Sequence, residues 1–199
     1  MKQFDDIKQL ADELKNIGIC NKKFIVGIDG FLEAGKTFLA NNLRDILGAN
    51  YINVIDIDDK ERKYYPRNRG SIIKYTDFKK IKGDIINSKT SIFFASACLL
   101  QIFEKIKITP DIYIYVRRMA KRIGKAPNIW LDKDDCTFAD DINEWENNKI
   151  SKTLRFDNQT NTVDVKKSLM TRKEVVQYHQ KYKPHESANY CYYRNEDLL

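Results

Sequence analysis

Residues 30–37 have the types and the spacing of a phosphate-binding loop. Their sequence, Gly-Phe-Leu-Glu-Ala-Gly-Lys-Thr, fits the pattern G-x-x-x-x-G-K-[ST] at every position. In such a loop the backbone N–H groups surround phosphate oxygens, and the helix that follows directs its positive end at them. Lys36 is expected to reach the outer phosphates and Thr37 to bind Mg²⁺. The residues assigned to the nucleotide are Gly30, Leu32, Glu33, Ala34, Gly35, Lys36, Thr37 and Phe38.

The segments on either side of the loop have the pattern that it requires. Residues 24–29 are apolar and β-prone, and after the loop Phe38, Leu39, Leu43, Ile46 and Leu47 recur at helical spacing. A strand, a loop and a helix therefore follow in order, which favours a nucleotide-binding site over a chance glycine turn. The expected cofactors are ATP and Mg²⁺.

Two carboxylates follow the next predicted strand, which covers residues 51–57. Ligands of an open α/β sheet gather at the carboxyl ends of its strands, so Asp58 is the candidate catalytic base and metal ligand. Asp59 is the second candidate, on the substrate side. An aspartate after a strand is also common as a turn former or helix N-cap. Phosphoryl transfer is the chemistry that would use both the loop and Asp58.

Strands and helices alternate along the chain. The patterns predict strands at 24–29, 51–57, 91–97, 111–116 and 189–193. They predict helices at 4–17, 37–47, after Asp77, and at 99–106, 117–125, 138–145 and 171–182, with a polar loop at 126–136. The expected fold is three-layer α/β, with helices covering a parallel sheet of about five strands. A length of 199 residues suits one domain, residues 1–199.

The composition argues against several classes of protein. No apolar stretch reaches the length of a membrane span, and the N-terminus lacks a secretory signal. Cys20, Cys98, Cys136 and Cys191 are scattered, which indicates reduced thiols and a cytoplasmic protein. The net charge of +7 suits nucleic acid or polyanionic nucleotides, but the chain has no recognised nucleic-acid motif. The expected partners are a nucleoside triphosphate and a small-molecule acceptor; a homo-oligomer is compatible with the sequence.

Several segments resemble the uridine kinase and phosphoribulokinase group of P-loop kinases. They are residues 27–30, the loop to Thr37, Asp58 with Asp59, and the C-terminal runs 178–184 (Tyr-His-Gln-Lys-Tyr-Lys-Pro) and 187–190 (Ser-Ala-Asn-Tyr). The resemblance implies a P-loop kinase fold. It also implies ATP-dependent transfer of the γ-phosphoryl group to a hydroxyl of a small molecule, with a nucleoside as the expected acceptor, which Asp58 would activate.

The resemblance further implies an acceptor side and a lid. The loop after the catalytic aspartate contacts the acceptor in this group, so the candidate substrate residues are Asp59, Tyr64, Tyr65, Arg67, Arg69 and Tyr75. Group members carry arginines on a lid that clamps the donor phosphates, and residues 117–137 stand at about that place. On the helix predicted over 117–125, Arg118 and Arg122 share one face and are the candidate catalytic arginines, whereas Arg117 points elsewhere.

The chain departs from the group at two places. The group has a metal-supporting glutamate followed by glycine after its third strand, where this chain has Phe94-Ala95-Ser96-Ala97. The lid segment 124–130 also lacks the arginine-rich pattern of the group. Two alternatives therefore stay open: a catalytically degenerate nucleotide-binding regulatory protein, and a kinase for a nucleotide or nucleotide-sugar.

Overall fold

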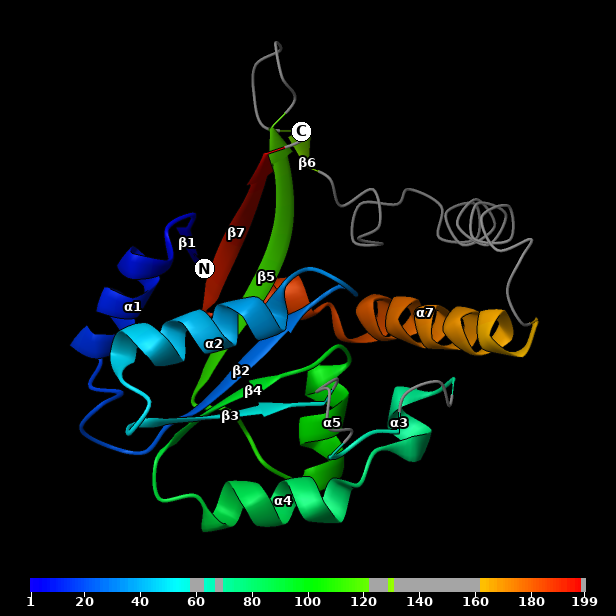
Figure 1. The fold of residues 1–199 in the computed structure, drawn as a ribbon, viewed down its shortest axis with the longest axis horizontal. Coiled ribbons are helices and arrows are strands. Elements are labelled where there is room, and N and C mark those ends of the chain that lie inside the picture. The colour runs from blue at the N-terminus through cyan, green and yellow to red at the C-terminus, as the bar shows by residue number, and fades with distance from the viewer. Residues whose placement is uncertain (58–62, 67–69, 122–128, 131–161, 198–199) are drawn as a thin grey trace.

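A sheet of parallel strands forms the centre of the molecule (Figure 1). The computed structural model describes residues 1–57, 63–66, 70–121, 129–130 and 162–197. Neighbouring strands follow the order β1 (Lys2–Phe4), β7 (Tyr190–Asp197), β5 (Ile112–Lys121), β2 (Ile25–Gly30), β4 (Ser91–Ala95) and β3 (Ile52–Asp56), all of them parallel. A short seventh strand, β6 (Ile129–Trp130), pairs antiparallel with β5.

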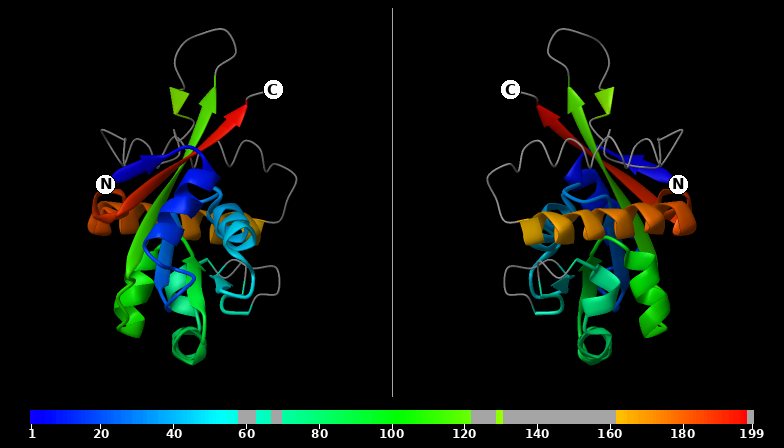
Figure 2. Two further views of the ribbon diagram at one scale, coloured as in Figure 1. Left: turned by 90° about the vertical axis from the view of Figure 1, so that its left-hand side faces the viewer. Right: turned by 90° about the vertical axis from the view of Figure 1, so that its right-hand side faces the viewer.

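Helices cover both faces of this sheet, as the two side views show (Figure 2). One core cluster joins α1 (Ile7–Asn16) and α2 (Lys36–Leu47) to the sheet. A second cluster joins α4 (Phe78–Asn87), α5 (Leu99–Ile106) and α7 (Thr162–Tyr182) to the opposite face. Two four-residue helices, α3 (Ile72–Tyr75) and α8 (Pro184–Ser187), complete the described elements. The predicted three-layer α/β fold is confirmed, with a larger sheet than expected.

The two cores arise from the alternation of side chains along each strand. In β5, Ile112, Ile114 and Val116 belong to the cluster of α1 and α2, whereas Tyr113 and Tyr115 belong to the opposite cluster. Helices cover both faces of the central strands, so side chains on both faces are buried and these strands read as apolar runs.

Two predicted helices differ from the structure. Phe4 lies in β1 opposite Tyr192, and α1 begins at Ile7, where Asp6 caps the N–H of Lys8 at 2.8 Å. Residues 117–121 continue β5 as a strand instead of forming a helix. Their register against β7 runs to Lys121 opposite Asp197, so the neighbouring strand supplies backbone partners that outweigh the helical preference of arginine and lysine. The polar loop predicted at 126–136 contains β6; the rest of it, and the helix at 138–145, lie outside the described residues.

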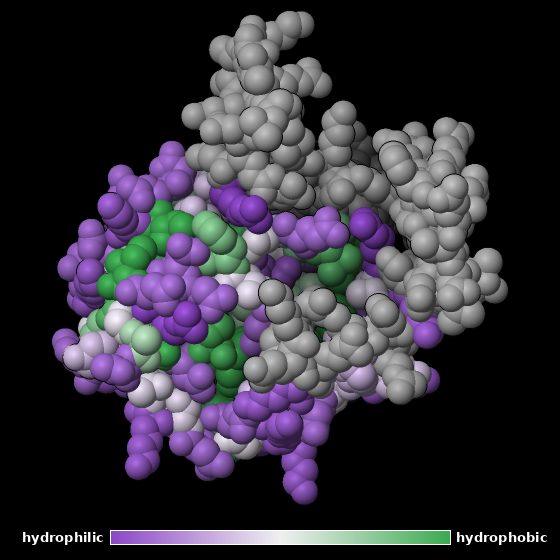
Figure 3. Space-filling model, in the orientation of Figure 1, coloured by the Kyte–Doolittle hydropathy of each residue, from purple (hydrophilic) through white to green (hydrophobic). Residues whose placement is uncertain are grey.

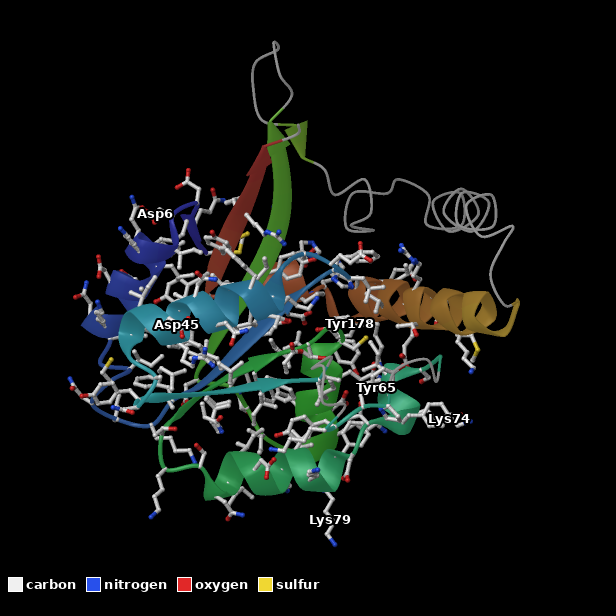
Figure 4. All side chains as sticks on the ribbon, in the orientation of Figure 1. Asp6, Asp45, Tyr65, Lys74, Lys79 and Tyr178 are labelled. Atoms are coloured by element: carbon white, nitrogen blue, oxygen red, sulfur yellow. The ribbon has the colours of Figure 1, made fainter. Side chains whose placement is uncertain are left out.

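Hydrophilic residues cover most of the described surface on the face drawn in Figure 3. Lys74 and Lys79 point away from the body of the molecule (Figure 4). Among the helices that the structure describes, none combines the length and the apolar character needed to cross a membrane. Cys98 and Cys191 are buried, and Cys20 is partly buried.

Candidate functional site

The segment between β2 and α2 forms a tight loop anchored in both cores. Phe31 is buried on the side of α5 and α7, and Ala34 is buried on the side of α1 and α2. The N–H of Ala34 donates to the carbonyl of Phe31 at 3.2 Å, which closes the turn. Glu33 and Gly35 have left-handed backbone angles, with φ of 65° and 95°. Side chains of the loop itself therefore hold it between the two cores.

Lys36 and the start of α2 place positive charge around this loop. The Lys36 ammonium donates to the carbonyl oxygens of Gly30 at 3.1 Å and Phe31 at 2.7 Å. Gly35 precedes the first helical residue and provides no side-chain cap for the first N–H groups of α2. The N-terminal end of a helix carries a partial positive charge, so an anion is favoured at this position.

Thr37 makes the contact that links the loop to the end of β3. Its hydroxyl donates to Oδ2 of Asp56 at 2.6 Å. Asp56 is the last residue of β3, lies opposite Ala95 of β4 and is buried. The predicted carboxylate at this place is Asp58, and Asp56 is not among the predicted site residues. The alternation of β3 was the available signal, because Ile52 and Val54 face α2 and place residue 56 on the same side.

Asp29, directly before the loop, is fully buried within a network of hydrogen bonds. Its Oδ1 accepts the N–H of Gly30 at 2.7 Å, and its Oδ2 accepts the hydroxyl protons of Tyr113 and Tyr178. Burial raises the pKa of the Asp29 carboxyl, and the nearby His179 and the two tyrosine donors oppose that rise. The network therefore ties the end of β2 to β5 and to α7.

The C-terminal motif that resembles the kinase group lies against the base of the loop. Tyr178, at the end of α7 that meets the sheet (Figure 4), bonds Asp29, and its hydroxyl accepts the N–H of Leu100 at 3.1 Å. The His179 ring packs against Phe31 with centroids 5.4 Å apart, and its Nε2 lies 3.0 Å from the hydroxyl of Tyr115. Two segments about 150 residues apart in the sequence thus form one structural unit.

The end of β4 carries no carboxylate. Ser96, Ala97 and Cys98 are buried there, and burial raises the pKa of the Cys98 thiol well above its usual value. Across the part of the chain that the structure describes, no group of three His, Cys, Asp or Glu residues could hold a metal by itself. The hydroxyl of Thr37 and the carboxylate of Asp56 lie side by side. Oxygen atoms of this kind suit a metal that is bound mainly through phosphates and water.

The remaining candidate residues fall into four sets. Tyr64 and Tyr65 are buried in the core, and the Tyr64 hydroxyl donates to Asp84 at 2.7 Å. Tyr75 is 38% exposed at the end of α3. Arg118 lies in β5, opposite Arg194 of β7, so its predicted place on a helix is wrong. Outside the described residues are Asp58, Asp59, Arg67, Arg69 and Arg122. The functional roles assigned to all of these residues stay predictions.

A groove of about 380 Å³ lies between α3, α5 and α7. Its walls combine charged, amide and aromatic side chains, among them Lys74, Gln101, Glu174, Lys181 and Tyr182. Tyr178 also lines it, so the groove borders the network that supports the loop. Groups of this kind can bind the hydroxyl groups of a small polar molecule.

The comparisons with known proteins find similarity only among solved structures. No protein-family model and no curated protein matches the chain. A possible uridine kinase from Bacillus stearothermophilus superposes with a TM-score of 0.52 and 15% identity, over 94% of this chain and 96% of that one. A candidate fructose transport system kinase from Silicibacter sp. TM1040 gives a TM-score of 0.49 and 10% identity, over 94% and 98% of the two chains. The likeness to the first structure shows that the chain has the fold of the P-loop kinases, the group that its sequence resembles.

Proposed function

We propose that this protein is an ATP- and Mg²⁺-dependent phosphotransferase that moves the γ-phosphoryl group to a hydroxyl of a small molecule, with a nucleoside as the expected acceptor. The observation that carries the proposal is the hydrogen bond of 2.6 Å between Asp56 and Thr37, the residue that follows Lys36. It brings a hydroxyl and a carboxylate together at the end of a loop that suits phosphate. Phosphoryl transfer needs these parts side by side.

The donor would bind through the loop backbone and the first turn of α2. The N–H groups there favour an anion, and Lys36 would move from the carbonyls of Gly30 and Phe31 to the β- and γ-phosphates. The fold of the described residues supports this placement, since β2, the loop and α2 follow one another as in a phosphate-binding unit.

The residues at the loop suit Mg²⁺ better than a transition metal. Mg²⁺ takes oxygen ligands and is usually held by one or two carboxylates together with substrate phosphates and water. Thr37 would bind the metal through its hydroxyl, with Asp56 orienting that hydroxyl and Asp58 as the further candidate ligand. Bound there, Mg²⁺ would neutralise the negative charge that develops on the transferring phosphoryl group.

The transfer itself would proceed by in-line attack. The acceptor oxygen forms a bond to the γ-phosphorus, the bond from that phosphorus to the bridging oxygen breaks, and ADP leaves. The hydroxyl proton passes to a carboxylate, for which Asp58 is the proposed base because the hydroxyl of Thr37 already bonds Asp56. Arg118 and Arg122 are proposed to bind the transferring phosphates. The groove between α3, α5 and α7 is the proposed acceptor site.

A phosphate-transfer screen tests this proposal. The protein is incubated with Mg-ATP and a panel of nucleosides, vitamins and sugars, and products are detected by their gain of one phosphoryl group in mass. We expect one chemical class to be phosphorylated, and Asp58→Asn to abolish transfer while ATP still binds. If Asp58→Asn transfers at the rate of the wild type, another group accepts the proton.

A nucleotide-binding regulatory protein without efficient catalysis is the second candidate. The end of β4 favours it, because residues 94–98 offer no carboxylate to support a metal. This candidate predicts tight ATP binding with no acceptor-dependent release of ADP across the whole panel. Formation of any phosphorylated product above the background of Lys36→Ala argues against it.

A further inference from the structure

Arg194, on the last strand of the sheet, lies directly against the phosphate loop. A Cβ atom added to Gly35 would lie 2.7 Å from Cδ and 3.0 Å from Cζ of Arg194. The guanidinium also stacks on the ring of Phe38, with Cζ 5.4 Å from the ring centroid. Gly35 and Phe38 flank Lys36 and Thr37, so the arginine reaches the residues that would hold the donor phosphates.

The loop is shaped to accept this side chain. Gly35 has a φ of 95°, which an L residue adopts only with strain, and its open side is occupied by Arg194. Any side chain at residue 35 would meet the guanidinium as well as the strained backbone. The glycine therefore serves both the turn and the close approach of Arg194.

Arg194 places a positive charge beside the residues that would hold the donor phosphates. The guanidinium lies against Gly35 and Phe38, beside the positive end of α2, where an anion is favoured. An arginine over an aromatic ring can still donate hydrogen bonds to phosphate from its guanidinium N–H groups, so the two contacts are compatible. Arg118 of β5 is opposite Arg194 in the sheet register.

We infer that Arg194 is a donor-binding residue that contacts the phosphates of the nucleoside triphosphate, brought to the loop by β7 and oriented by Phe38. The inference rests on the proposed function, since it names a further residue of the same donor site. It assigns the contact to the phosphates and not to the base, because the guanidinium lies against the loop residue that directly precedes Lys36.

Calorimetric titration with Mg-ATP and with magnesium tripolyphosphate, which has no base, tests this inference. The variants are Arg194→Ala, Arg194→Lys, Phe38→Ala and Lys36→Ala. Arg44→Ala serves as the control of equal charge, because Arg44 lies in the last turn of α2 and pairs with Asp45. We expect Arg194→Ala to lower the affinity for both ligands about 10- to 100-fold and Arg194→Lys to lower it less. Phe38→Ala should lower the affinity for both ligands slightly, and Arg44→Ala should leave it unchanged.

Three results would overturn the inference, and they differ from one another. If Arg194→Ala binds both ligands within twofold of the wild type while Lys36→Ala binds neither, Arg194 is not a donor residue. If Arg194→Ala loses affinity for ATP alone, the arginine contacts the base. If the wild type binds neither ligand, the proposed function fails and this inference fails with it.

Discussion

The Thr37 hydroxyl donates to the Asp56 carboxylate at 2.6 Å and so joins the first turn of α2 to the last residue of β3. Asp56 lies on the face of the sheet that α2 covers, because Ile52 and Val54 of the same strand pack in the cluster that holds α2. This contact orients the threonine oxygen. A metal that binds the hydroxyl would then find its first protein ligand already oriented.

Removing either partner of this pair should weaken the response to Mg²⁺. We expect Asp56→Asn to raise the Mg²⁺ concentration needed for half-maximal transfer about 10- to 100-fold, since partners that orient a metal ligand have effects of this size. Thr37→Ala should lose the response to Mg²⁺, while Thr37→Ser, which keeps the hydroxyl, should retain it. Titration of transfer activity with Mg²⁺ at saturating ATP measures all three. An Asp56→Asn curve identical to that of the wild type would contradict a role for this pair.

The strand, loop and helix at residues 25–47 could be predicted from the sequence because local rules govern them. The loop pattern, the strand before it and the apolar spacing of α2 agree, and Asp77 caps α4 as its position suggests. Asp56 and Asp29 were not predicted as site residues, because their hydrogen bonds are made with segments that are distant in the sequence. Asp29 offered a signal, since an aspartate inside an apolar strand needs a buried partner.

The segment predicted to be a helical lid with arginines shows where a local pattern is misleading. Residues 117–121 carry the charge and composition of an exposed helix, yet they extend β5 because β7 offers a full set of backbone partners. That pairing joins residues more than seventy positions apart, with Arg117 opposite Tyr193, and no window along the sequence contains both strands. Arg194 was not predicted as a site residue for the same reason, because it contacts the loop at Gly35 from a distant part of the sequence.

The bond between Tyr178 and Asp29 should affect stability in a pH-dependent way. Burial raises the pKa of Asp29 above its unfolded value of 3.8, so ionisation of Asp29 costs stability as the pH rises from that value through the folded pKa. Tyr178→Phe removes a donor that lowers this pKa and should cost about 1–3 kcal/mol at neutral pH. The loss should shrink as the pH falls below the folded pKa of Asp29, because the protonated carboxyl depends less on this donor.

Urea unfolding of the wild type and Tyr178→Phe at several pH values measures this effect. Tyr182→Phe is a suitable control, because its hydroxyl donates to Glu104 at the surface and not to Asp29. A Tyr178→Phe penalty that is constant from pH 4 to neutral pH would show that the carboxylate does not depend on this donor.

Glu174 of α7 caps the N-terminal end of α3, about 100 residues earlier in the sequence, and should stabilise that helix. Its carboxylate accepts the hydroxyl of Ser71 at 2.7 Å and the N–H groups of Ile72 and Ile73. We expect Glu174→Ala to cost about 0.5–2 kcal/mol, as loss of a helix cap does, and Glu174→Gln to cost less. Hydrogen exchange at the Ile72 and Ile73 amides should quicken in Glu174→Ala. The exposed Glu186→Ala should leave both amides unchanged, and equal protection in Glu174→Ala would disprove the cap.

The central claim is that the loop holding Lys36 binds ATP for transfer to a small molecule. The most direct measurement is the amount of phosphorylated product and of ADP formed from Mg-ATP and the panel of acceptors by the wild type and by Lys36→Ala. We predict equal amounts of product and ADP from the wild type, and at least about a 100-fold loss in Lys36→Ala with the fold preserved. Product formed by Lys36→Ala at the rate of the wild type would contradict the claim, as would a wild type that forms no product from any acceptor.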